Sequence, residues 1–427
     1  METKFSIYQL FVRLFGNTNA EPVFYGDKSQ NGCGTLDDIT SKAIKGIKSL
    51  GITHIWLTGV PEHASLTSYP ELGIPPDNAW IVKGKAGSPY AIKDYFDVSP
   101  DLARNPKQRM KAFEQAVKRI HKEGLKVIID FVGNHVSRQY HCDTAEGELF
   151  EFGKQDDPSI AFSPFNNYYY LPGQNFIVPQ GIQLPEGVTA AAYIESPARA
   201  TGNDCFTAHP HIHDWYETVK LNFGVDYQHG AVTHFDPIPD TWHKMKAVLL
   251  FWASKGVDGF RCDMAELVPA EFWGWVIDAV KTQYPHIVFI AEVYDPQRYA
   301  TYMSVGKFDF LYDKVGLYDE LRLLLEEKGN ANHISKVWQS QEGYGHKMLR
   351  FIENHDEHRV ASKHFAGDAW KGIPAMALCD LMGKGPFMIY NGQETGEKGD
   401  EVSGFSGADG KTTIFDYWHM PTLLKWV

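Results

Sequence analysis

Short apolar runs recur along the chain, separated by segments in which apolar and polar residues alternate with a helical period. We interpret eight of the apolar runs as buried strands. The predicted strands cover residues 5–11, 54–60, 126–132, 258–262, 288–293, 308–312, 348–352 and 386–390.

The segments between these runs predict amphipathic helices. In residues 105–123, Met110, Phe113, Val117 and Ile120 recur at intervals of three or four, and the pattern stops at Gly124. Eight repeats of a strand followed by a helix favour an α/β fold of the parallel (β/α)8 TIM-barrel type over an open doubly wound sheet. Further predicted helices cover residues 240–255, 269–284, 317–328 and 359–382.

One connection is far longer than a barrel loop. About 105 residues, rich in Pro, Gly, Tyr and His, separate the third strand from the helix that begins near Asp240. We therefore predict an inserted subdomain at residues 136–235, with the barrel formed by residues 1–135 and 236–427. After the eighth strand the residues are mostly Gly and polar, so we expect the last barrel helix to be missing.

Charge and composition exclude several classes of partner. The chain has 41 basic and 53 acidic residues, a net charge of −12, and no run of Lys and Arg, which argues against nucleic acid. It has no apolar stretch long enough to span a membrane, and its first residues lack a signal-peptide pattern. We expect a cytoplasmic protein, or a secreted or periplasmic one if a signal peptide has been removed.

Acidic residues stand at the ends of several predicted strands. Catalytic groups of parallel barrels lie at the carboxyl ends of their strands. Asp263 follows the fourth strand, Glu292 lies at the end of the fifth, and Asp356 comes shortly after the seventh. These three carboxylates are expected to meet at one mouth of the barrel.

Four short segments resemble the signatures of the alpha-amylase family, family thirteen of the glycoside hydrolases. They are Asp-Phe-Val-Gly-Asn-His at 130–135, Gly-Phe-Arg-Cys-Asp at 259–263, the surroundings of Glu292, and His-Asp at 355–356. Their order and strand placement agree with that family. The resemblance implies a retaining enzyme that cleaves α-glucosidic bonds of α-1,4-glucan or maltooligosaccharides, with the insertion as domain B. The antiparallel C-terminal domain usual in relatives is expected to be absent from this chain.

The resemblance also implies catalytic roles. Asp263 would be the nucleophile and Glu292 the general acid and base, as a retaining glycosidase requires. Asp356 would bind sugar hydroxyls and favour a distorted ring. Arg261, two residues before Asp263 and so on the same strand face, can hold that carboxylate ionised through a charge-assisted hydrogen bond.

Substrate contacts are expected from the same segments. By resemblance, His135 and His355 would donate hydrogen bonds to the sugar, and Tyr90 would stack beneath it or pack in the core. Asp130 and Arg359 are also expected to bind substrate.

A cofactor is not required by this chemistry, but calcium is possible. Asn134 is either a calcium ligand, as in many relatives, or a satisfied polar group. Residues 264–267, Met-Ala-Glu-Leu, lack the Lys-His pair of many calcium-binding amylases, which leaves the leaving-group side of the cleft undefined.

Other polar and aromatic segments have two readings. Three histidines at 209–213 suggest either metal binding or a polar surface loop, and Pro210 favours the loop. Residues 168–170 and 215–216 are aromatic and suit sugar stacking as well as core packing.

Two other functions are alternatives to glycoside hydrolysis on the same sequence. A transglycosylase would use the same residues with a sugar hydroxyl in place of water. A non-catalytic carbohydrate-binding or interaction relative typically loses members of the acidic triad, whereas Asp263, Glu292 and Asp356 are all present.

Overall fold

Eight parallel strands close into a barrel in the computed structural model, which describes residues 4–144, 150–184, 187–400, 405 and 407–423. The strand order is β15-β14-β13-β12-β5-β2-β1-β16. The ring is completed by a parallel bridge between Arg350 and Phe387, where the Met388 amide donates to the Arg350 carbonyl at 2.9 Å. The (β/α)8 barrel is therefore confirmed. Its strands are β1 (Ser6–Phe11), β2 (His54–Thr58), β5 (Lys126–Val132), β12 (Gly259–Asp263), β13 (Val288–Ala291), β14 (Phe310–Tyr312), β15 (Met348–Leu349) and β16 (Phe387–Tyr390).

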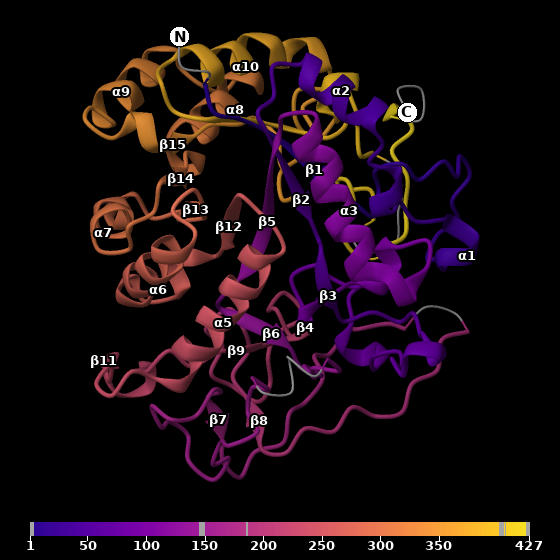
Figure 1. Cartoon of the computed structure of the whole chain (residues 1–427), viewed down its shortest axis with the longest axis vertical. Coiled ribbons are helices and arrows are strands. Elements are labelled where there is room, and N and C mark those ends of the chain that lie inside the picture. Colours follow the sequence, from indigo (N-terminus) through magenta and orange to yellow (C-terminus); the bar gives the residue numbers. More distant parts are fainter. Residues whose placement is uncertain (1–3, 145–149, 185–186, 401–404, 406, 424–427) are drawn as a thin grey trace.

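Helices surround this barrel (Figure 1). In α3 the predicted apolar positions Phe113, Val117 and Ile120 are buried. Gly124 follows the helix with a left-handed φ of 78°, a conformation that ends helices. No helix in the described part of the chain combines the length and the apolar character needed to cross a membrane. The α-helices of the described residues are α1 (Lys28–Asn31), α2 (Ser41–Ser49), α3 (Arg109–Lys122), α5 (Asp240–Ser254), α6 (Ala270–Gln283), α7 (Tyr299–Ser304), α8 (Asp319–Leu325), α9 (Asn332–Ser340) and α10 (Gly372–Leu381).

The predicted helix at 359–382 is wrong in its first half. Only α10 is helical, preceded by a 3-10 turn at Ala369–Lys371. Pro374 has no amide hydrogen, and its ring clashes with the carbonyl four residues earlier in a continuous helix, so it is accommodated in the first turn of α10. The Asp368 side chain accepts a hydrogen bond from the Trp370 amide at 3.0 Å and starts the turn there.

In the described residues of the long connection between β5 and α5, the strands form short antiparallel ladders, and none of these ladders joins the barrel sheet. In Figure 1 the strands β7, β8 and β11 of this connection lie at the opposite end of the view from α8, α9 and α10. After β2 the chain forms an antiparallel ribbon in which β3 pairs with β4. This ribbon was not predicted, because β4 contains charged residues although all of it is buried. The short strands are β3 (Pro61–His63), β4 (Ile92–Val98), β6 (His135–Ser137), β7 (Tyr170–Leu171), β8 (Ala198–Arg199), β9 (Thr218–Lys220), β10 (Val225–Asp226) and β11 (Val232–Thr233).

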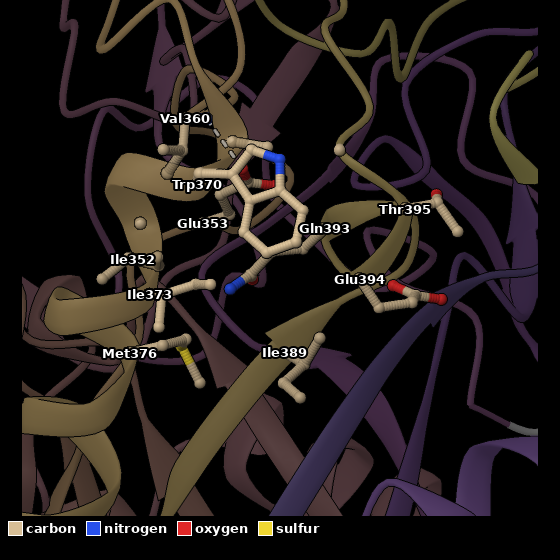
Figure 2. Close-up of a pocket in the computed structure, with 13 residues that line it drawn as sticks. Ile352, Glu353, Val360, Trp370, Ile373, Met376, Ile389, Gln393, Glu394 and Thr395 are labelled. Atoms are coloured by element: carbon tan, nitrogen blue, oxygen red, sulfur yellow. Dashed lines mark hydrogen bonds between the residues drawn. The ribbon is translucent and has the colours of Figure 1, made fainter.

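Beside β16 the barrel leaves an apolar cavity of about 340 Å³. Figure 2 shows Ile389 of β16 facing Ile373 and Met376 of α10, with Trp370 above them. Trp370 is 77% exposed. Within the described residues after β16 the chain contains a 3-10 turn, Gln393–Thr395, and no α-helix.

A buried ion pair links the residues that directly follow β14 and β15. Arg350 Nε lies 3.3 Å from Asp313 Oδ2, and Arg350 Nη2 donates to Gln341 Oε1 at 3.0 Å. Gln341 Nε2 in turn donates to Asp313 Oδ1 at 2.8 Å. All three side chains are buried, so they depend on one another for most of their polar contacts.

We predict that Arg350→Met lowers the free energy of unfolding by about 3–5 kcal/mol, because it leaves the Asp313 carboxylate buried without its cation. Chemical denaturation measures the change. The double variant Arg350→Met/Asp313→Asn should recover part of the loss, since it removes the uncompensated charge. A single variant within 1 kcal/mol of the wild type would contradict this account.

Candidate active site

The three predicted acids surround one pocket of about 320 Å³. Asp263 is the last residue of β12, and Glu292 directly follows β13. The register pairs Cys262 with Ala291, so the next residue of each strand, the acid, stands beside its neighbour. Asp356 enters the pocket from the segment after β15.

Arg261 lies beneath the pocket and contacts both strand-end acids. Its Nη1 donates to Asp263 Oδ1 at 2.6 Å, and its Nη2 lies 2.7 Å from Glu292 Oε2. Its Nε donates to the Tyr312 hydroxyl at 3.1 Å. The side chain is fully buried, so its charge acts on these carboxylates with little screening by water.

Asp130 lies in the floor rather than in the pocket lining. Its carboxylate accepts from Trp56 Nε1 at 2.9 Å and lies 3.4 Å from Arg261 Nη1. Burial raises the pKa of Asp130 to about 7, although Arg261 opposes the shift. Tyr90 does line the pocket, and its ring stacks on His355 with the centroids 5.1 Å apart.

Both predicted histidines line the pocket and are neutral near pH 7. Burial lowers the pKa of His135 to about 4 and that of His355 to about 3. The Gln9 amide nitrogen lies 2.9 Å from His355 Nδ1, so we assign the His355 proton to Nε2, which is 3.1 Å from Asp356 Oδ2. His135 contacts the Trp215 ring at a centroid distance of 5.2 Å.

The three acids influence one another's protonation. Burial raises the pKa of Asp263, Glu292 and Asp356, and Arg261 opposes the shift in each case. The negative charges of Asp263 and Asp356 raise the pKa of Glu292 further. One guanidinium is the cation for three neighbouring carboxylates, so the protonation of each acid depends on that of the others. The group of acids therefore keeps a proton at pH values above the usual pKa range of carboxyl groups.

Two further donors hold the Glu292 carboxylate. The Met264 amide donates to Glu292 Oε2 at 2.8 Å, and the Tyr294 hydroxyl donates to Oε1. Met264 takes a left-handed φ of 41°, which is uncommon for a residue with a side chain. This backbone turn directs its amide hydrogen at Glu292.

Several lining residues were not predicted from the sequence. Tyr294 lies two residues after Glu292, a spacing that could have indicated a shared direction at the strand end. Lys83 and Glu217 form an ion pair of 2.8 Å in the lining. Ile414 and Phe415 come from the loop after β16, and no sequence pattern connects them to the site.

Arg359 is not brought to the pocket. Its Nη1 donates to Glu353 Oε2 at 2.9 Å, and its Nε donates to Thr412 Oγ1 at 2.7 Å. It is fully buried, and these contacts join the segment after β15 to the loop after β16. The expected role of Arg359 as a substrate contact therefore stays a prediction that its position does not support.

The residues around Asn134 do not fit a calcium ion. Lys220 Nζ donates to Asn134 Oδ1 at 2.7 Å and pairs with Asp204, while Asn134 Nδ2 donates to the Gly202 carbonyl at 2.7 Å. An ammonium group therefore already holds the one oxygen that Asn134 could offer, and a second cation beside it would be repelled. The reading of Asn134 as a satisfied polar group agrees with these contacts.

The other candidate segments lie outside the pocket, apart from Trp215. Tyr168, Tyr169 and Tyr170 are buried and pack in the insertion. The residues at 209–213 form an irregular segment in which the histidines are exposed, as expected for a surface loop.

Comparisons with known proteins agree with this arrangement. The family described as "Alpha amylase, catalytic domain" matches residues 9–181 and 237–415. "Alpha-amylase 3" of Dictyoglomus thermophilum is 22% identical over 432 residues, covering 97% of this chain and 70% of that protein. An alpha-1,4-glucan:maltose-1-phosphate maltosyltransferase of Cereibacter sphaeroides is 34% identical over 92 residues, covering 20% of this chain and 16% of that protein.

A solved structure shows the same fold over nearly the whole chain. The ligand-free cyclic alpha-maltosyl-(1→6)-maltose hydrolase from Arthrobacter globiformis superimposes with a TM-score of 0.63 at 18% identity, covering 96% of this chain and 78% of that one. The family match spans most of the chain, and it includes all four signature segments. The chain therefore belongs to the alpha-amylase catalytic-domain family.

Proposed function

We propose that this chain is a retaining glycoside hydrolase that cleaves α-glucosidic bonds of α-1,4-glucan or maltooligosaccharides. The observation that carries the proposal is the pair Asp263 and Glu292, side by side on neighbouring strands and bridged by Arg261. Neighbouring strands lie about 4.8 Å apart. That spacing suits the roughly 5 Å separation of the two carboxyls in retaining enzymes and not the 6.5–9.5 Å of inverting ones.

In the first step, Asp263 attacks the anomeric carbon and the glycosidic carbon–oxygen bond breaks. Glu292 transfers its proton to the departing oxygen and becomes a carboxylate. The Met264 amide and the Tyr294 hydroxyl then stabilise the new negative charge, since both already donate to Glu292. Arg261 keeps Asp263 ionised for the attack through its 2.6 Å hydrogen bond.

In the second step, Glu292 takes a proton from water, and the water oxygen attacks the anomeric carbon while the bond to Asp263 breaks. The two displacements restore the α configuration. The His355 Nε2–H can donate to the sugar hydroxyls that Asp356 accepts from, and Tyr90 supplies an apolar ring beneath the sugar. Carboxyl groups provide both the nucleophile and the proton, so neither step requires a cofactor.

We assign residues 136–235 to domain B. It contributes Trp215, which contacts His135, and Glu217, which pairs with Lys83, to one wall of the pocket. A transglycosylase is the second candidate, and the match to a maltosyltransferase favours keeping it. Product lengths from maltoheptaose distinguish the two: hydrolysis gives only shorter chains, whereas transfer also gives longer ones. A purely binding role is opposed by the three retained acids, which share one pocket.

The acid role of Glu292 predicts a difference between two substrates. Glu292→Gln should lose several orders of magnitude in turnover on maltooligosaccharides but much less on α-glucosyl fluoride, because fluoride leaves without a proton. Asp263→Ala should be inactive on both, since it removes the nucleophile. Steady-state kinetics with the two substrates test this, and an equal loss on both for Glu292→Gln would remove it from the acid role.

Tyr294 predicts a shift in pH dependence. Its hydroxyl stabilises the ionised form of Glu292, so Tyr294→Phe should raise the pKa of Glu292. The acid then stays protonated to higher pH, and the alkaline limb of kcat/KM should move up by about half a unit to one unit. Tyr284→Phe, at the end of α6 and outside the pocket, is the matched control. A downward or absent shift in Tyr294→Phe would contradict the assignment.

The double displacement predicts the product anomer. Freshly released sugar should be the α anomer, because each of two inversions occurs at the same carbon. Proton NMR during the first minutes of digestion, before mutarotation, reads the anomer directly. Initial β product would exclude the roles given to Asp263 and Glu292.

A further inference from the structure

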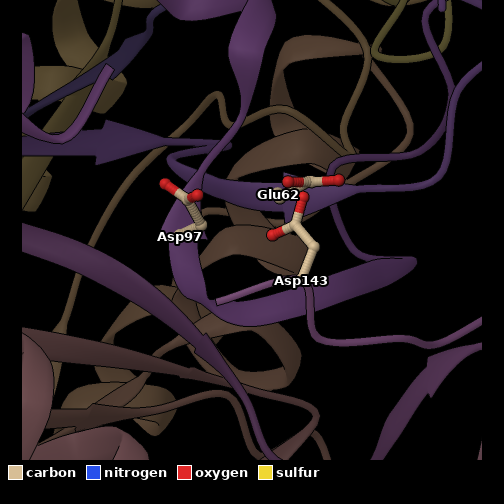
Figure 3. A group of neighbouring side chains, drawn as sticks. All are labelled: Glu62, Asp97 and Asp143. Carbon is tan, nitrogen blue, oxygen red and sulfur yellow. The ribbon is translucent and has the colours of Figure 1, made fainter. Parts of the chain in front are cut away.

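Three carboxylates gather outside the active-site pocket, where the ribbon after β2 meets the start of the insertion. They belong to Glu62 of β3, Asp97 of β4 and Asp143, which follows β6 (Figure 3). One oxygen from each lies within 4.8 Å of the others. Carboxylate oxygens that share one calcium ion at 2.3–2.6 Å are at most about 5 Å apart, so this spacing fits a common ion.

One oxygen of the buried Glu62 carboxyl, Oε2, has no hydrogen-bond donor among the described residues. Glu62 is 3% exposed. An unsatisfied buried carboxylate is costly, and the groups that Glu62 faces here are two more acids, which cannot donate to it when ionised.

Nearby cations neutralise the group only in part. Asp97 pairs with Arg109, but Lys93 is shared with Asp77 at 3.2 Å. Asp94 adds a further carboxylate, and its Oδ2 accepts from the Asp143 amide at 3.0 Å. This hydrogen bond fixes Asp143 against β4 and so holds its side chain beside Glu62 and Asp97.

We propose that Glu62, Asp97 and Asp143 bind one divalent cation that prefers oxygen ligands, with Ca²⁺ as the expected ion. The donor set consists of carboxylates alone, which suits Ca²⁺ or Mg²⁺ rather than metals that prefer imidazole or thiolate. Asp143 is exposed and gives the ion a route from solvent, while Glu62 closes the buried side. Asp97 can contribute although Arg109 binds it, since a carboxylate has about four acceptor positions.

The site would link the mouth of the barrel to the insertion. Asp97 and Glu62 lie on the β3–β4 ribbon, and Asp143 lies in the segment that follows β6. On the same β4, the Tyr95 hydroxyl donates to the carbonyl of Val132, the last residue of β5, and lies 3.2 Å from the carbonyl of His135, the first residue of β6. The ion would therefore stabilise the ribbon that supports the strand next to β12, without touching substrate.

The test uses the whole chain, treated with EDTA and then titrated with Ca²⁺ or Mg²⁺. Calorimetry should show one Ca²⁺ bound per chain, and the ion should raise Tm. Glu62→Gln and Asp143→Asn keep the side-chain shape but remove a charged ligand, and each should weaken Ca²⁺ binding at least tenfold. Glu71→Gln, an exposed acid between β3 and β4, is the matched control and should bind as the wild type does.

The Tm in EDTA separates a metal ligand from a structural acid. For a ligand, Glu62→Gln should keep or raise the Tm in EDTA and lose the increase that Ca²⁺ causes. The proposal is overturned if the wild-type chain shows no binding and no Tm change with Ca²⁺ up to millimolar concentration, which would mean that the acids share a proton instead. It is also overturned if Glu62→Gln and Asp143→Asn bind Ca²⁺ as tightly as the wild type, since the ion would then lie elsewhere.

Discussion

The buried guanidinium of Arg261 is the charge on which the active-site end of the barrel depends. Asp263 and Glu292 stand on adjacent strands, and two uncompensated carboxylates so close and so deeply buried would repel each other strongly. Arg261 contacts both and is itself oriented by Tyr312. The closed sheet supplies this geometry, because β12 lies between β5 and β13, and Arg261 therefore reaches an acid on either side.

The sequence was informative wherever a single local pattern decides the structure. Apolar runs predicted all eight barrel strands, since most residues of these strands are buried. The acids at their ends were predicted because strand ends meet at one mouth. The β3–β4 ribbon was not, since charged residues inside a buried strand depend on partners distant in the chain, as Arg109 is for Asp97. Ile414 and Phe415 reach the pocket only through the loop after β16.

Two charged contacts in this molecule use cations that belong to the chain itself. The buried Lys220 side chain donates to Asn134 and pairs with the exposed Asp204. At Asp313 the cation is again an internal side chain, that of Arg350. An internal ammonium or guanidinium cannot be removed by a chelator, so these contacts should respond to substitution and hardly at all to the ionic composition of the solvent.

The hydrogen bond from Met264 has a consequence for how this cleft can diversify. The donor is a main-chain amide, so a change of side chain at position 264 leaves it in place, provided that the new residue tolerates the left-handed backbone. The side chain at 264 nevertheless lines the pocket beside Asp263 and Glu292. Mutation can therefore reshape the wall that meets the substrate while the proton-transfer chemistry is inherited unchanged. Selectivity and catalysis are thus separable traits at this position.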